Sequence, residues 1–251
     1  MSILLYEKKD HIAYITLNLP PLNTMSVELS RQVIKALHDF DHDNDLYVAI
    51  ITGTGERSFC AGADLTDPEH IEEGVDWEVN WDWQLANVRK PLIAAINGYC
   101  LGGGFTLALC CDIRIAAEKA SMGTPDQKLN TVDAYASIML SRMIPASIAM
   151  EVLMTGDRLS AQEAYRIGLV SRVVPQDQLM PTAELLAKKI CGNGPVALWA
   201  CKEINKRAGH MSLEDSLSLF KALTAPILKM DDTKEGITAF FEKRSPRWTL
   251  K

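Results

Sequence analysis

A run of three glycines at residues 102–104 constrains the fold of this 251-residue chain more than any other feature. The run separates an apolar segment at residues 91–96, typical of a buried strand, from a segment at residues 105–111 that has few polar groups and is typical of a buried helix. Glycine lets the backbone come very close to whatever binds there. A helix that begins in glycines also presents free N–H groups, which stabilise an anion or a developing oxyanion.

A second loop of small residues occurs at residues 60–64, with the sequence CAGAD, and it also follows a strand-like apolar run, at residues 48–52. Glycine runs before helices are common, so one such loop is a weak signal. Two loops together could supply two N–H donors to one oxygen atom.

Composition narrows the class of protein. Apolar residues make up 47% of the chain and charged residues 23%, which are ordinary values for a globular protein with a sizeable core. The net charge of −6 and the lack of a long basic stripe argue against nucleic-acid binding. The six cysteines show no CxxC spacing, so we expect reduced thiols and no metal site. The first residues show no signal-peptide pattern and no apolar run has membrane-span length, so we expect a cytoplasmic location and no membrane partner.

Strands alternating with helices predict an α/β fold built from βαβ units. We expect residues 53–63 to form a loop and the last quarter of the chain to be helical, with Pro226 interrupting the final stretch. We divide the chain into a core domain at residues 1–195 and a helical region at residues 196–251. Strands are predicted at residues 3–8, 12–17, 47–52, 91–96, 113–116 and 121–123, and helices at residues 27–41, 105–111, 133–144, 147–153 and 160–167. The pattern is mostly helical at residues 180–208 and 213–244.

Several spaced motifs, in this order, resemble the crotonase family of enoyl-CoA hydratases and isomerases. They are ITLNLPPLNTMS at residues 15–26, SFCAGADL at 58–65, INGYCLGGG at 96–104, EVLMTGDRLSAQEAYRIGLVSRVVP at 151–175 and EGITAFFEKRSPRW at 235–248. The resemblance covers nearly the whole chain. It implies a spiral of ββα turns, followed by a helical C-terminal region that packs in trimers, often paired into hexamers.

The resemblance also implies a chemistry. The substrate would be an acyl-CoA thioester, with coenzyme A as part of the substrate and no further cofactor. Its carbonyl would sit in an oxyanion hole formed by the backbone N–H groups of Ala63 and Gly103, and the resulting enolate would be protonated, hydrated, isomerised or cleaved. The adjoining residues expected to contact the substrate are Ala61, Asp64, Leu65 and Gly102.

The acidic residues depart from the pattern of the family. Its usual hydratases have a glutamate two residues after the glycine triplet, where this chain has Thr106, and a second glutamate after a proline, where it has Asp126. A threonine hydroxyl can position water but is a poor base; alternatively, it bonds to a carbonyl one turn back along the helix. Asp126 is either the general acid/base or a turn residue after proline.

Asp133 is a second candidate acid, seven residues after Asp126. Dehalogenases of the same family have a nucleophilic aspartate at what looks like the matching place. The alternative is that Asp133 caps the helix that follows it.

Four further residues are weaker candidates. Trp77 and Trp81 share one helix face and either line an acyl pocket or pack as part of a covering helix. Arg57 and Lys243 are tentative contacts for the phosphates of coenzyme A, although solvated surface charge explains each of them as well.

We therefore predict an acyl-CoA enzyme that hydrates an enoyl thioester or moves its double bond. One alternative is a hydrolytic, carbon–carbon-cleaving or dehalogenase-like enzyme that uses Asp133. Another is a family member that binds acyl-CoA or RNA without turnover.

Overall fold

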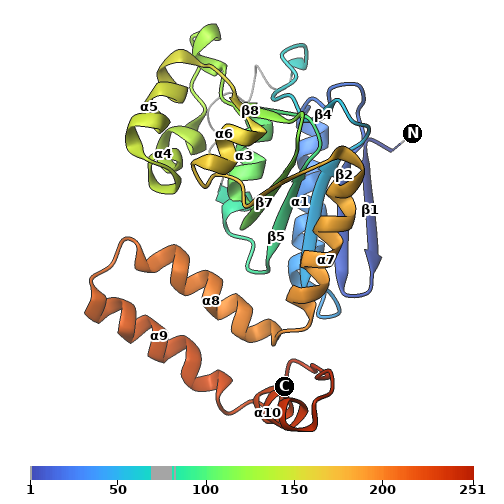
Figure 1. Cartoon of the computed structure of the whole chain (residues 1–251), viewed down its shortest axis with the longest axis vertical. Helices are drawn as coiled ribbons and strands as arrows, with labels where there is room; N and C mark the ends of the chain where they lie inside the picture. The colour runs from blue at the N-terminus through green and yellow to red at the C-terminus, as the bar shows by residue number, and fades with distance from the viewer. Residues whose placement is uncertain (1, 69–80, 82) are drawn as a thin grey trace.

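A computed structural model describes residues 2–68, 81 and 83–251 of the chain (Figure 1). Its main sheet has six strands in the order β1-β2-β3-β5-β7-β10. β1 and β2 pair antiparallel, and every other neighbouring pair is parallel, which confirms the predicted α/β class. The strands are β1 (Leu4–Lys9), β2 (Ile12–Leu17), β3 (Val48–Gly53), β5 (Leu92–Ile96), β7 (Ile113–Ala117) and β10 (Arg172–Val174).

Helices cover both faces of this sheet, which is why β3 and β5 are buried at every position. α1 (Val27–His42) begins at Ser26, whose side chain accepts a hydrogen bond from the N–H of Leu29. Its apolar residues share a core cluster with Ile51, whereas Ile50 belongs to a second cluster with α7 (Leu179–Cys191). Successive strand residues point to opposite faces, so α1 and α7 lie on the two sides of the sheet, as Figure 1 shows.

A second, smaller sheet has the order β4-β6-β8-β9. Its strands are β4 (Ser58–Cys60), β6 (Tyr99–Leu101), β8 (Ser121–Gly123) and β9 (Leu159–Ser160). The expectation of a loop throughout residues 53–63 is wrong, because β4 lies within it, and β6 was not predicted. Strands of two or three residues are too short to show the alternation on which sequence prediction depends.

The short helices near the small sheet follow local capping signals. α3 (Gly103–Cys110) starts two residues earlier than predicted, inside the glycine run, and all of its residues after the first are buried. α4 (Ala134–Met143) and α6 (Ala161–Arg166) begin at Asp133 and Ser160, whose side chains accept N–H groups of the first turn. The others are α5 (Ala146–Thr155) and the 3-10 turns η1 (Asp126–Leu129) and η2 (Gln176–Gln178).

Three C-terminal helices extend away from the two sheets (Figure 1). They are α8 (Pro195–Ala208), α9 (Leu213–Ile227) and α10 (Asp231–Glu242). Pro226 does not interrupt a helix as predicted; it lies in the last turn of α9, and the break falls at residues 228–230. The division of the chain at residue 195 stays a prediction. In the part of the chain that the structure describes, no helix is both long and apolar enough to traverse a bilayer.

Candidate active site

The candidate site lies where three parallel strands of the small sheet end. β4 pairs with β6 through Cys60 and Cys100, and β6 pairs with β8 through Leu101 and Gly123. Because parallel strands end at the same edge of a sheet, the segments at residues 61–65, 102–106 and 124–126 leave it side by side. Close packing confirms this for the first two segments, because a Cβ atom placed on Gly62 would lie 3.7 Å from the Cα atom of Gly102.

The three glycines of the loop have three different roles. Gly102 adopts φ +49° and ψ −124° as the N-cap of α3, a conformation that L side chains rarely adopt. Gly104 packs against β4 so closely that a Cβ atom would meet the carbonyl oxygen of Cys60. A Cβ atom on Gly103, in contrast, would meet nothing within 4 Å, so the middle glycine faces open space.

The backbone N–H groups of Gly103 and Ala63 are among those at this edge for which no acceptor lies among the described residues. Gly103 is the first residue of α3, so its N–H has no partner within the helix. Ala63 forms an isolated parallel bridge with Met25, in which the neighbours of Ala63 make both hydrogen bonds: Met25 N–H donates to Gly62 at 2.8 Å, and Asp64 N–H donates to Met25 at 2.9 Å. The N–H of Ala63 itself therefore points away from Met25. The oxyanion hole of Ala63 and Gly103 stays a prediction.

Asp126 follows β8 and lies against the start of α3. A Cβ atom on Gly102 would be 3.3 Å from each carboxylate oxygen of Asp126. The hydroxyl of Thr124, which is buried, donates to Oδ2 of Asp126 at 2.6 Å and fixes the orientation of the carboxylate. Sequence reasoning missed Thr124; its position two residues before the acid, in the motif Thr-Pro-Asp, was the available signal.

The structure brings together Thr106 and Asp133, which are far apart in sequence. Asp133 caps α4, accepting the N–H of Ala136 at 2.8 Å, as one of the two sequence interpretations expected. Its carboxylate also accepts the hydroxyl of Thr106, at 2.8 Å to Oδ1 and 2.9 Å to Oδ2. The Thr106 hydroxyl therefore points to another helix rather than to a carbonyl of its own helix.

The other predicted residues differ in how well the structure places them. Asp64 closes a turn by accepting the N–H and the hydroxyl of Thr66, while Leu65 is exposed and Ala61 is half-buried. Trp81 is only 4% exposed and belongs to the main core, which supports packing, whereas Trp77 lies outside the described residues.

The two residues predicted to contact the phosphates lie outside these loops. Arg57 precedes β4, at the opposite end of that strand from Ala63. Lys243 is the C-cap of α10, with φ +55°. Figure 1 shows α10 in the C-terminal region, far from α3 and β8. The assignment of either cation to the phosphates of coenzyme A stays a prediction.

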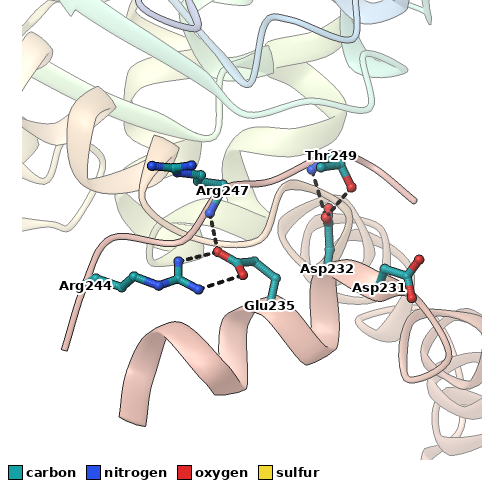
Figure 2. A pocket seen from close by; sticks show the side chains of 6 residues that line it. All are labelled: Asp231, Asp232, Glu235, Arg244, Arg247 and Thr249. Carbon is teal, nitrogen blue, oxygen red and sulfur yellow. Dashed lines mark hydrogen bonds and ion pairs between the residues drawn. The ribbon is translucent and has the colours of Figure 1, made fainter. Parts of the chain in front are cut away.

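A charged cavity of about 470 Å³ lies beside α10, and two of the acids that line it, Glu235 and Asp232, bind the C-terminal segment (Figure 2). Glu235 accepts two hydrogen bonds from the guanidinium of Arg244 and one from the N–H of Arg247. Asp232 accepts the N–H and hydroxyl of Thr249. These hydrogen bonds hold the C-terminal segment against α10, which gives the charged residues of the cavity a structural role.

The chain is similar to proteins of known type over nearly its whole length. The family model described as enoyl-CoA hydratase/isomerase matches residues 7–251. A probable mitochondrial enoyl-CoA hydratase of Dictyostelium discoideum is 38% identical over 98% of this chain and 90% of its own. A carnitinyl-CoA dehydratase of Proteus mirabilis is 39% identical over 93% of each chain. The crystal structure of an enoyl-CoA hydratase from Bacillus anthracis superposes with a TM-score of 0.94 at 34% identity, covering all of both chains, which confirms the predicted fold class.

Proposed function

Because the chain belongs to the enoyl-CoA hydratase/isomerase family, we propose that it adds water to the double bond of an enoyl-CoA thioester, or removes water in the reverse direction. The chain is an enzyme, and the alternative of a non-catalytic acyl-CoA or RNA-binding protein is set aside. Relatives named enoyl-CoA hydratase and carnitinyl-CoA dehydratase represent the two directions of such a reaction.

The proposed mechanism passes through an enolate of the thioester. The N–H groups of Ala63 and Gly103 would bind the thioester oxygen and stabilise the negative charge that develops on it. Asp126 would exchange a proton with the carbon atom next to the carbonyl. No cofactor is needed beyond the coenzyme A that the substrate carries, because the reaction consists of the addition of water to the double bond and the transfer of a proton to the resulting electrostatically stabilised anion.

One observation carries this proposal: the parallel register of β4, β6 and β8. It brings the segments that contain Ala63, Gly103 and Asp126 to the same edge of one sheet. A Cβ atom on Gly102 would lie 3.3 Å from the Asp126 carboxylate, so the proton carrier lies close to the loop that would bind the oxyanion.

Replacement of Asp126 by asparagine tests the proposal. We expect Asp126→Asn to lower turnover of enoyl-CoA thioesters by about 100–10,000-fold, with nearly unchanged binding, because the amide cannot exchange the proton. Loss of ultraviolet absorbance of the enoyl thioester measures turnover, and calorimetry measures binding. Asp177→Asn, at an exposed position in η2, is the matched control. Full activity of Asp126→Asn would overturn the assignment.

Double-bond isomerisation is the second candidate, and Thr106 is the observation that favours it. With no glutamate at this position, Asp126 alone could remove a proton from one carbon and return it to another. Product analysis distinguishes the two reactions, because isomerisation adds no oxygen from labelled water. Attack by Asp133 as a nucleophile fits less well, since its carboxylate is buried and hydrogen-bonded to both Thr106 and Ala136.

We further propose that the chain assembles into trimers or hexamers, in keeping with its family. The cytoplasmic location expected from the sequence stays a prediction.

A further inference from the structure

Thr106 and Asp133 form a buried side-chain pair that joins α3 to α4. Thr106 is 2% exposed and Asp133 is 4% exposed. The hydroxyl oxygen of Thr106 lies 2.8 Å and 2.9 Å from the two carboxylate oxygens of Asp133. A hydroxyl has one hydrogen to donate, and here that hydrogen is directed at the carboxylate.

This arrangement fixes what Thr106 can do for a third group. Because its hydrogen is committed to Asp133, Oγ1 can only accept from any other partner. In the described part of the chain, no N–H or O–H group donates to this oxygen. Thr106 therefore offers a lone pair that can accept a proton, while its own hydrogen is already bonded to a carboxylate. In this arrangement the carboxylate can act as a base through the hydroxyl.

The pair also lies next to the proposed reaction centre. The N–H of Thr106 donates to the carbonyl of Gly102 at 2.9 Å, so Thr106 is one helical turn beyond the glycine on which a Cβ atom would lie 3.3 Å from the Asp126 carboxylate. Residues three and four apart share one side of a helix, which places Thr106 on the side of Gly102 and Gly103. Asp126 and the Thr106–Asp133 pair thus border the same first turn of α3.

We propose that Thr106 and Asp133 act as a relay that activates the water molecule in the hydration, an inference that rests on the proposed function. Water donates to Oγ1 of Thr106. As its oxygen forms a bond to the substrate carbon, its O–H bond breaks and a new Oγ1–H bond forms. The original Oγ1–H bond breaks at the same time, and its proton passes to Asp133.

The protons balance over the whole reaction. The electron pair of the carbon–carbon double bond moves to the thioester oxygen as the enolate forms. Asp126 then donates a proton to the enolate carbon, and the proton held by Asp133 returns through Thr106 to solvent while solvent reprotonates Asp126. Thr106 touches the reacting water and is the catalytic residue of the pair. Asp133 acts through it as a positioning residue and proton acceptor.

Two activities measured on the same variants test the relay. One is hydration of an enoyl-CoA thioester. The other is exchange of the proton next to the carbonyl of a saturated acyl-CoA in deuterium oxide, followed by nuclear magnetic resonance, which uses Asp126 and the oxyanion hole but no attacking water. We expect Thr106→Val and Asp133→Asn each to lower hydration by at least about 100-fold, with exchange close to that of the wild type.

Controls separate the relay from a structural contact. Thr106→Ser keeps the hydroxyl, so this variant should retain most of the hydration activity. Thr106→Val combined with Asp133→Asn should hydrate no more slowly than either single variant, because the two residues act as one unit. Asp133→Asn keeps a capping side chain, so it should fold even if Thr106→Val does not. Circular dichroism checks the fold of each variant.

The outcomes divide cleanly. Loss of hydration with retained exchange supports the relay. Retained hydration in both single variants overturns it, as does loss of hydration and exchange together in folded protein. A wild-type chain that catalyses neither reaction would overturn the proposed function itself, and the relay with it.

Discussion

Gly102 and Gly103 are adjacent residues, but only Gly102 has a backbone conformation and surroundings that disfavour a side chain. Gly102 needs its positive φ of +49°, and a Cβ atom there would press on the Asp126 carboxylate, whereas a Cβ atom on Gly103 would meet nothing. We expect Gly102→Ala to lower the free energy of unfolding by about 1–3 kcal/mol and to reduce turnover. Gly103→Ala should leave stability unchanged or slightly higher, because alanine is the better helix former. Urea denaturation measures both, and equal losses of stability would contradict this account.

At the level of single residues, the sequence was sufficient to name candidate residues for the site but not their hydrogen-bond partners. Thr106, Asp126 and Asp133 stand out by their type and their distance from the glycine run. The hydrogen bonds between Thr106 and Asp133 span 27 positions and depend on how α3 packs against α4. No local pattern encodes that packing. In sequence, each of these residues therefore has a local structural role as an alternative to a role in the site.

Lys90 links the end of α1 to the start of β5, and its ammonium group is buried. Nζ donates to the carbonyls of Phe40 at 2.8 Å and Asp43 at 2.5 Å. Burial lowers the pKa of Lys90 to about 8, from an ordinary value of 10.5. Between these two pH values the unfolded chain holds a proton that the folded chain has released. The contribution of Lys90 to the free energy of unfolding therefore rises with pH across this window, by at most about 1.4 kcal/mol per pH unit.

Comparison with Lys90→Met isolates this effect, because the other titrating groups are common to both proteins. We expect the variant to be less stable at every pH, since two buried carbonyls lose their donor. Its deficit relative to the wild type should grow between pH 8 and pH 10.5. Urea denaturation at several pH values measures the difference, and a constant deficit would show that Lys90 does not titrate with a lowered pKa.

Prediction of the elements succeeded where they were long. The five-residue and six-residue strands of the main sheet carry apolar runs that are visible in sequence, and β3 and β5 were expected as buried strands. β4 and β6 have three residues each and were missed. Without β4 and β6, the relative placement of the loops of the candidate site could not be predicted, because the register of these short strands aligns the loops. That alignment is a property of the sheet as a whole.

At the scale of the whole molecule, the C-terminal helices leave an apolar surface uncovered. No residue of α9 is buried, and Leu213, Leu217 and Phe220 are 77%, 52% and 49% exposed. Their spacing of four and three residues places them along one side of the helix. A stripe of this kind on an isolated helix pair is typical of a surface that another chain covers.

We therefore expect α9 to contribute to the contact between subunits. Light scattering of the wild type should give three or six times the 27.8 kDa mass of one chain. Leu217→Asp combined with Phe220→Asp should shift the protein towards the single-chain mass, because buried and unpaired carboxylates are costly at an interface. Ser218→Asp combined with Ala222→Asp adds the same charge to another exposed side of α9 and should leave the assembly intact. A single-chain mass for the wild type, or equal effects of the two pairs, would show that this stripe does not hold the subunits together.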